Sequence, residues 1–307
     1  MPKLLEMLGY KRPHGSESEA TFIAKFIDTV PGMTQDAFGN RLLKLGYSTT
    51  LFSCHTDTVH RHPGTQKLVY DPGLNIIYKD DDEPLGADDA AGIWVLLQLI
   101  EARVPGLYVF HRGEECGGLG SHFIASQTPG LLDGIQRAVA FDRRGRHDVI
   151  THQASGRCCS DAFALALADE LRMGHKPSLL GIFTDTANYT DLIPECTNVS
   201  VGYEHEHTAN EMLDLDYLEL LAQSVIAVDW ESLTAQRQPT QNDLYGDDWY
   251  DFVLTNPEAA AALLRRHNPT EEEIDQALLE AEDYYNDYRY LGNRISKGLF
   301  DNDDDKW

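Results

Sequence analysis

Residues 50–57 read TLFSCHTD: a short apolar run, a histidine at its end, and an aspartate two positions further on. The run is short, apolar and bounded by polar residues, as expected of a buried strand. Residues 107–111 and 137–141 are similar runs, and acidic side chains follow each of them. Because ligands of open α/β sheets lie beyond the carboxyl ends of the strands, this repetition indicates a site at one edge of a sheet.

Strand-like runs alternate with helical patterns over the first two-thirds of the chain. This alternation predicts an α/β fold with three α/β/α layers, in which a mixed, mostly parallel central sheet lies between helices. Further strands are expected at 41–45, 75–78 and 198–202, and helices at 4–8, 18–30, 92–102, 161–173 and 212–228.

The charge of the chain is unusual. Its 50 acidic and 25 basic residues give a net charge of −25, which repels phosphates and anionic membranes, so we predict neither a nucleic acid nor a membrane partner. No run of about 18 apolar residues predicts a transmembrane helix. The five cysteines have no framework spacing, and the first residues lack the apolar core of a signal peptide, so we expect a cytoplasmic location.

The composition changes near residue 237. Residues 237–307 hold 17 acidic and 7 basic side chains, a difference of −10. Residues 238–242 resemble a linker, 257–267 and 269–288 have helical patterns, and 301–305 form an acidic end that we expect to be disordered. The sequence therefore predicts a catalytic domain over 1–236 and an acidic, partly helical C-terminal extension over 237–307.

Five short motifs carry the chemistry. In order along the chain they are His55-Thr56-Asp57, Gly86-Ala87-Asp88-Asp89, Glu114-Glu115, Asp142, and the run from His205 to Glu211. Taken singly, each has a structural explanation, such as a helix cap for the paired aspartates or a solvated charge pair for the paired glutamates. Together they supply the imidazole and carboxylate ligands that zinc prefers, including a carboxylate that two metals can share. The set predicts a two-metal hydrolytic site.

On these motifs the chain resembles the di-zinc exopeptidase superfamily, which includes peptidase T, the bacterial leucine aminopeptidases, the tetrahedral aminopeptidases and the carboxypeptidase G type. Weaker matches lie at 15–19, 36–40 and 181–185, and the resemblance covers roughly residues 10–230. It implies the zinc exopeptidase (phosphorylase/hydrolase-like) fold and two divalent metal ions, zinc or alternatively cobalt or manganese.

The resemblance also implies roles for single residues. His55 and Asp142 are expected to bind one metal, and Glu115 and His207 the other. The family's bridging aspartate precedes the last glycine of its motif by four positions, which selects Asp88 as the shared ligand.

Two ligand assignments stay open at this point, and two further roles follow from the motifs. Asp89 is the alternative to Asp88, and His205 is the alternative to His207. Glu114 is expected to be the general base that takes a proton from a metal-bridged water. Asp57 is expected to hold the second nitrogen of the His55 imidazole, as outer carboxylates do in metal sites.

The function that follows is a metal-dependent exopeptidase, an aminopeptidase acting on short peptides. One alternative is an amidohydrolase that removes the acyl group from an N-acyl amino acid with the same two metals, and another is a non-catalytic binding protein on this scaffold. Only 65 residues separate Asp142 from His207, which leaves little room for an inserted lid domain. A homo-oligomer is compatible with the family.

Overall fold

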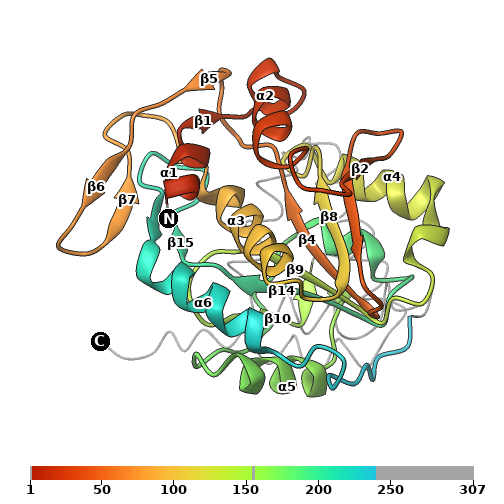
Figure 1. The fold of residues 1–307 in the computed structure, drawn as a ribbon. Coiled ribbons are helices and arrows are strands. Elements are labelled where there is room, and N and C mark those ends of the chain that lie inside the picture. The colour runs from red at the N-terminus through yellow and green to blue at the C-terminus, as the bar shows by residue number, and fades with distance from the viewer. Residues whose placement is uncertain (1, 154–155, 240–307) are drawn as a thin grey trace, which may run out of the picture. The chain divides into compact units, whose positions relative to one another are not determined.

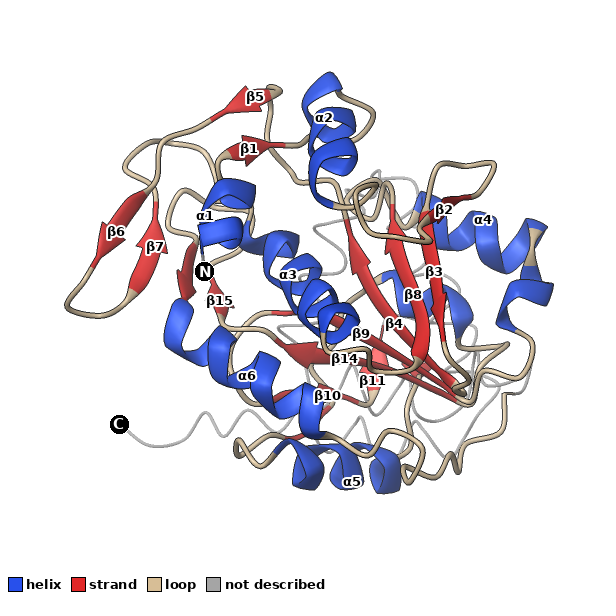
Figure 2. Ribbon diagram, viewed as in Figure 1, coloured by secondary structure: helices blue, strands red, loops and turns tan. Residues whose placement is uncertain are grey.

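The computed structural model describes residues 2–153 and 156–239 (Figures 1 and 2). Its main sheet has eight strands in the order β13-β10-β14-β9-β4-β8-β3-β2. In that order the strands span Lys176–Ser178, Asp148–Ile150, Glu195–Ser200, Arg137–Arg143, Thr50–His55, Gly106–His111, Arg41–Leu45 and Thr34–Gln35. The four central strands, β14 to β8, run parallel, whereas β3, β2 and β10 join antiparallel. The expected mixed, mostly parallel sheet is confirmed.

The register of the central strands brings their carboxyl ends to one edge. Strand β4 pairs with β8, so that His55 lies opposite His111, and with β9, so that Ser53 lies opposite Ala140. All residues of these three strands are buried. The polar residues that follow them therefore meet at the same edge of the sheet.

Helices cover both faces of the sheet. On one face, α3 (Ala87–Glu101) packs against β4, β9 and its neighbour α6 (Leu215–Ala227), as Figure 1 shows. On the other face lie α4 (Leu119–Gln127) and the 3-10 helix η2 (Asp185–Tyr189). The helix α1 (Pro2–Leu8) packs on α3, and α5 (Asp161–Leu171) packs on α6. The remaining helices of the described residues are α2 (Glu17–Phe26) and the 3-10 helix η1 (Pro129–Leu132). The expected three layers are confirmed.

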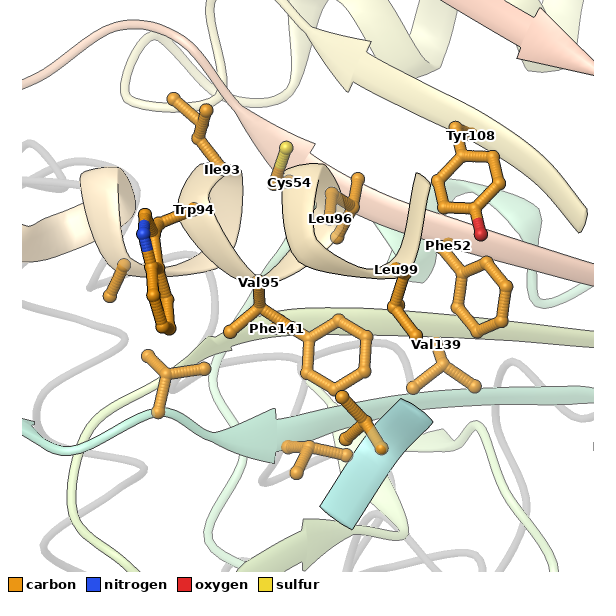
Figure 3. Close-up of a cluster of buried hydrophobic side chains, with 14 of the residues drawn as sticks. Phe52, Cys54, Ile93, Trp94, Val95, Leu96, Leu99, Tyr108, Val139 and Phe141 are labelled. Atoms are coloured by element: carbon orange, nitrogen blue, oxygen red, sulfur yellow. The ribbon is translucent and has the colours of Figure 1, made fainter. Parts of the chain in front are cut away.

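Helix α3 forms the centre of the core. Val95, Leu96 and Leu99 lie among Phe52 and Phe141 of the sheet (Figure 3). Burying each of these side chains stabilises the fold by about 1.5–3 kcal/mol. This packing fixes the N-terminus of α3, and with it the paired aspartates, beside the ends of β4 and β9.

Gly92 permits this close approach. A Cβ atom at this position would lie 2.0 Å from the carbonyl oxygen of Phe141 and 2.5 Å from a carboxylate oxygen of Asp89. Because any side chain would push α3 away from β9, the glycine of the motif is a packing requirement of the sheet edge.

Two expectations need correction. The strand expected at 198–202 is β14 (Glu195–Ser200), which starts at a buried glutamate. Glu195 begins a buried strand because its carboxylate accepts hydrogen bonds from the backbone and hydroxyl of Ser160 and from the backbone of Arg237. The helix expected from 212 starts at 215, because β16 (Met212–Asp214) pairs with β7 instead.

Smaller sheets complete the fold. The strand expected at 75–78 is β7 (Ile76–Tyr78), and it belongs to a separate four-stranded sheet with β6 (Val69–Asp71), β16 and β15 (Tyr203–Glu204). Strand β1 (Tyr10–Lys11) pairs with β5 (Gly64–Thr65), and β11 (His152–Gln153) pairs with β12 (Gly156–Arg157). The loop between β15 and β16 holds residues 205–211.

The expected division at residue 237 stays a prediction. The helices and the acidic end expected within 240–307 lie outside the described residues. Within the described part of the chain, no helix has the length and apolar character needed to cross a membrane.

Candidate metal centre

Three side chains meet at the ends of β4, α3 and β9. The His55 Nε2 atom lies 2.9 Å from Asp88 Oδ1 and 3.5 Å from Asp142 Oδ1. All three residues are buried. These residues, which we term the inner group, offer one nitrogen and two carboxylate oxygens within 4.8 Å of one another, a donor set suited to a divalent metal.

A second set of three shares Asp88 with the first. The His207 Nε2 atom lies 2.9 Å from Asp88 Oδ2 and 3.0 Å from Glu115 Oε1. His207 stands on the loop between β15 and β16, and its side chain is 38% exposed. We term Asp88, Glu115 and His207 the outer group. The two carboxylate oxygens of Asp88 thus face one imidazole each.

The neighbouring candidates face other partners. Asp89 is turned toward the backbone, where its carboxylate accepts hydrogen bonds from the N–H groups of His55 and Gly92. His205 is exposed, and its carbonyl accepts a hydrogen bond from the Thr208 hydroxyl. The geometry brings Asp88 and His207, rather than Asp89 and His205, into the two groups.

Glu114 lies beside both groups. It is 3% exposed, and its carboxylate lies within 4.8 Å of ligand atoms of His55 and Glu115. The adjacent glutamates of the loop after β8 are therefore both directed toward the same edge of the sheet.

Asp57 shapes the loop that carries these glutamates. Its carboxylate accepts hydrogen bonds from the backbone N–H groups of Gly113, Glu114 and Glu115, at 2.9, 3.2 and 3.2 Å. Its distance to the His55 Nδ1 atom is 3.6 Å, and that nitrogen has no hydrogen-bond partner among the described residues. Asp57 lies on the Nδ1 side of the imidazole, and the role expected of it there stays a prediction. Its three hydrogen bonds with the 113–115 loop are a feature that the spacing did not reveal.

Hydroxyl groups hold Asp142 in place. Thr184 donates a hydrogen bond to Asp142 Oδ2 at 2.6 Å, and Tyr203 donates one to Oδ1 at 3.1 Å. The Asn198 side chain bonds both the N–H and the carbonyl of Asp142. Sequence reasoning missed these partners, although Thr184 lies within the weak motif match at 181–185.

A buried arginine ties together the loops of the inner group. Arg12 donates a hydrogen bond from Nε to the Thr56 carbonyl at 2.9 Å, and from Nη2 to the Gly86 carbonyl at 3.4 Å. Burial lowers its pKa to about 10, although nearby carboxylates such as Asp89 and Asp57 favour its charge. Glu211 supports the same segment by accepting hydrogen bonds from Gly86 and Asp88 N–H groups. No sequence signal singled out Arg12.

The centre carries a strongly negative charge because several carboxylates lie close together. Burial and the charge of Asp88 raise the pKa of the Asp142 and Glu115 carboxyls. Burial acts on Asp88 too, but its hydrogen bonds with His207 and His55 hold the pKa of that carboxyl far below its usual range. Burial opposes a charge on His207, yet its hydrogen bonds to Asp88 and Glu115 raise its pKa to about 12. Crowded carboxylates that favour positive charge between them fit divalent cations.

Neither the comparison with protein families nor that with curated proteins gives a match. Comparison with solved structures shows which fold the chain shares. A tripeptidase from Staphylococcus aureus subsp. aureus Mu50 has a TM-score of 0.63 at 16% identity, over 75% of this chain and 96% of that one. Aminopeptidase PepT from Bacillus cereus ATCC 10987 has a TM-score of 0.59 at 16% identity, over 76% and 98%. The chain therefore shares the three-layer α/β fold of these two peptidases.

A third solved structure shares the fold. The Pyrococcus horikoshii TET1 peptidase, described as able to assemble into a tetrahedron or a large octahedral shell, has a TM-score of 0.52 at 18% identity. The match covers 73% of this chain and 98% of that one.

Proposed function

We propose that this chain is a two-metal exopeptidase, an aminopeptidase that hydrolyses short peptides. The observation that carries the proposal is the shared carboxylate: Asp88 faces His55 with one oxygen and His207 with the other. A carboxylate between two imidazoles suits two cations about 3.5–4 Å apart. The likeness of the fold to a tripeptidase and to aminopeptidases supports a peptide substrate.

The two groups would each hold one divalent cation. His55, Asp88 and Asp142 would hold the first, and Asp88, Glu115 and His207 the second. Nitrogen and carboxylate donors suit zinc, with cobalt and manganese as alternatives. Bound cations would polarise the carbonyl of the scissile bond and lower the pKa of the attacking water.

Glu114 would move the proton. Its carboxylate takes a proton from the attacking water and delivers it to the amine of the leaving group, which is the role of a general base that turns into a general acid. The low exposure of Glu114 keeps bulk water from competing for this proton. Asp57 keeps Glu114 in place through the backbone of residues 113–115.

The test combines metal analysis with a substrate panel. We expect about two metal ions per chain, and hydrolysis of free-amine dipeptides and tripeptides that a chelator abolishes. The Glu114→Gln variant should keep its metals and lose at least about a hundredfold in kcat. Undiminished peptide hydrolysis by Glu114→Gln would overturn the mechanism, and cleavage of N-acyl amino acids alone would favour a deacylase.

Assembly is a further part of the proposal. By analogy with the shell-forming TET1 peptidase, we propose that copies of this chain form a homo-oligomer. Light scattering coupled to size exclusion measures the mass in solution, and a mass of 34.4 kDa would contradict the proposal.

A further inference from the structure

Arg112 links two parts of the sequence that the proposed mechanism does not use. It is the first residue of the loop between β8 and α4, which carries the two adjacent glutamates of the centre. The weak motif match at 15–19 supplies one of its partners, Glu19, and the match at 36–40 supplies another, Asn40. Both matches therefore converge on the start of this loop.

Arg112 binds Glu19 through two hydrogen bonds. The guanidinium donates from Nε to Glu19 Oε1 at 3.1 Å and from Nη2 to Glu19 Oε2 at 2.7 Å. The Glu19 side chain is 0% exposed, and that of Arg112 is 23% exposed. Paired bonds between a planar guanidinium and a carboxylate fix direction as well as distance. The pair therefore holds the start of the loop in one orientation.

The same carboxylate holds the segment that follows His55. Its Oε1 atom also accepts a hydrogen bond from the Thr56 hydroxyl at 2.8 Å, and Oε2 accepts one from the Gly15 N–H at 2.7 Å. Thr56 directly follows His55 of the inner group. Glu19 thus joins the strand end that carries the inner histidine to the loop that carries Glu114.

Asn40 closes the loop at its base. Its Oδ1 atom accepts a hydrogen bond from the Arg112 N–H at 3.0 Å, and its Nδ2 atom donates one to the Gly120 carbonyl at 3.0 Å. The Gly120 N–H in turn donates to the Arg112 carbonyl at 2.9 Å. A Cβ atom at Gly120 would lie 2.1 Å from Asn40 Oδ1, so this closure requires a glycine. The two ends of the loop are therefore fixed to each other as well as to Glu19.

We propose that Arg112 is a positioning residue for the general base: by binding Glu19, it sets the place of Glu114 relative to the inner group. The proposal rests on the exopeptidase function above. Arg112 precedes Glu114 by two positions, so a change in the direction of the chain at Arg112 displaces the Glu114 carboxylate. Misplacement of a reacting group by about 1 Å can cost about a hundredfold in rate.

The experiment measures kcat and KM of metal-loaded variants on a free-amine tripeptide, in excess metal so that metal occupancy does not limit the rate. Arg112→Gln should lower kcat at least about tenfold and leave KM unchanged, because it displaces the proton-transfer group and not the substrate. Arg112→Lys should recover part of the loss, since lysine keeps the charge but not the paired geometry. The double variant Glu19→Gln/Arg112→Gln leaves no unpaired buried charge and should lose no more kcat than Arg112→Gln alone.

Hydrogen exchange of backbone N–H groups gives a second readout that does not depend on activity. In Arg112→Gln the N–H groups of residues 113–120 should exchange at least about tenfold faster than in wild type, because the base of the loop opens more readily. Arg41→Gln is the matched control. Arg41 binds Asp28 through Nε and Nη2 in the same paired way, and it lies on β3 opposite Phe110. Its loss should lower the melting temperature and leave both kcat and the exchange of residues 113–120 unchanged.

The outcomes separate this inference from the proposed function. Unchanged kcat or unchanged exchange in Arg112→Gln, a loss that lies in KM alone, or an equal loss in Arg41→Gln would overturn the inference and leave the peptidase proposal standing. Absence of peptide cleavage by wild type would overturn the peptidase proposal and, with it, the role of Arg112.

Discussion

The inner and outer groups of the centre use the same kinds of ligand in different settings. His55 and Asp142 stand on neighbouring strands of the central sheet and are buried. His207 stands on a loop with a positive φ of 63° and is 38% exposed. The inner group thus has its geometry fixed by the core, whereas one of the three outer residues, His207, depends on a loop at the surface.

This difference has a consequence for metal retention. Asp142 is held by Thr184 and Tyr203, and His55 by the register of the sheet, so the inner side chains would lose little freedom on binding the proposed ion. His207 is held mainly by Asp88 and Glu115 themselves. We therefore expect the inner ion to be bound more tightly than the outer one. Three predictions test this contrast, and a fourth concerns the pH dependence of stability.

Substitution of the shared residue should have the largest effect. Asp88→Asn keeps the shape of the side chain but removes the charge that faces both histidines. We expect less than one metal per chain and a loss of activity above about a hundredfold, measured by elemental analysis and peptide hydrolysis. Asp89→Asn is the comparison. If Asp89→Asn loses both metals while Asp88→Asn retains them, Asp89 and not Asp88 is the shared ligand.

Removal of each histidine should separate the two groups. His207→Ala should keep about one metal after dialysis against a weak chelator and recover activity in excess metal. His55→Ala should lose both, because Asp88 then has no fixed partner on the sheet. Circular dichroism checks that both variants fold, and equal metal loss from the two would refute the contrast.

A smaller effect is expected from the hydroxyl that supports Asp142. Tyr203→Phe removes one hydrogen bond and should weaken binding of the inner ion by about tenfold. Tyr217→Phe is the control, because its hydroxyl bonds the Arg146 carbonyl and His175 away from the centre. It should lower the melting temperature and leave metal affinity unchanged. Metal competition titrations measure the affinities, and unchanged affinity in Tyr203→Phe would remove this support for a preorganised inner group.

The smallest effect concerns the pH dependence of the stability of the fold. Burial and the nearby His147 lower the pKa of His175 to about 4, against about 6.5 in an unfolded chain. Between these pH values the unfolded chain binds a proton that the folded chain does not. The contribution of His175 to the free energy of unfolding is therefore fully present above pH about 6.5 and is lost as the pH drops toward 4. Urea unfolding of metal-free protein at pH 7.5 and 5.0 measures this. The His175→Gln variant should show a smaller difference between the two, and an identical difference would contradict the assignment.

Much of the centre could be predicted from the sequence. His55, Glu114 and Asp142 follow apolar runs, and a parallel sheet must bring the ends of such runs together. The sequence was less informative where a polar residue lies inside a buried strand instead of after its end. The buried Glu195 at the start of β14 was missed because only its hydrogen bonds from Ser160 and from the backbone of residues 236–237 make a buried carboxylate tolerable.

The sequence by itself determined the fold class and the chemical types at the sheet edge, because strand periodicity and ligand chemistry are local properties. Only the tertiary structure decided that Asp88 faces both histidines while Asp89 turns to the backbone. It also decided that Asp57 organises the 113–115 loop and that Arg12 joins two loops 30 residues apart in the chain, at Thr56 and Gly86. Such contacts depend on how distant segments pack, and neither spacing nor composition encodes that packing locally.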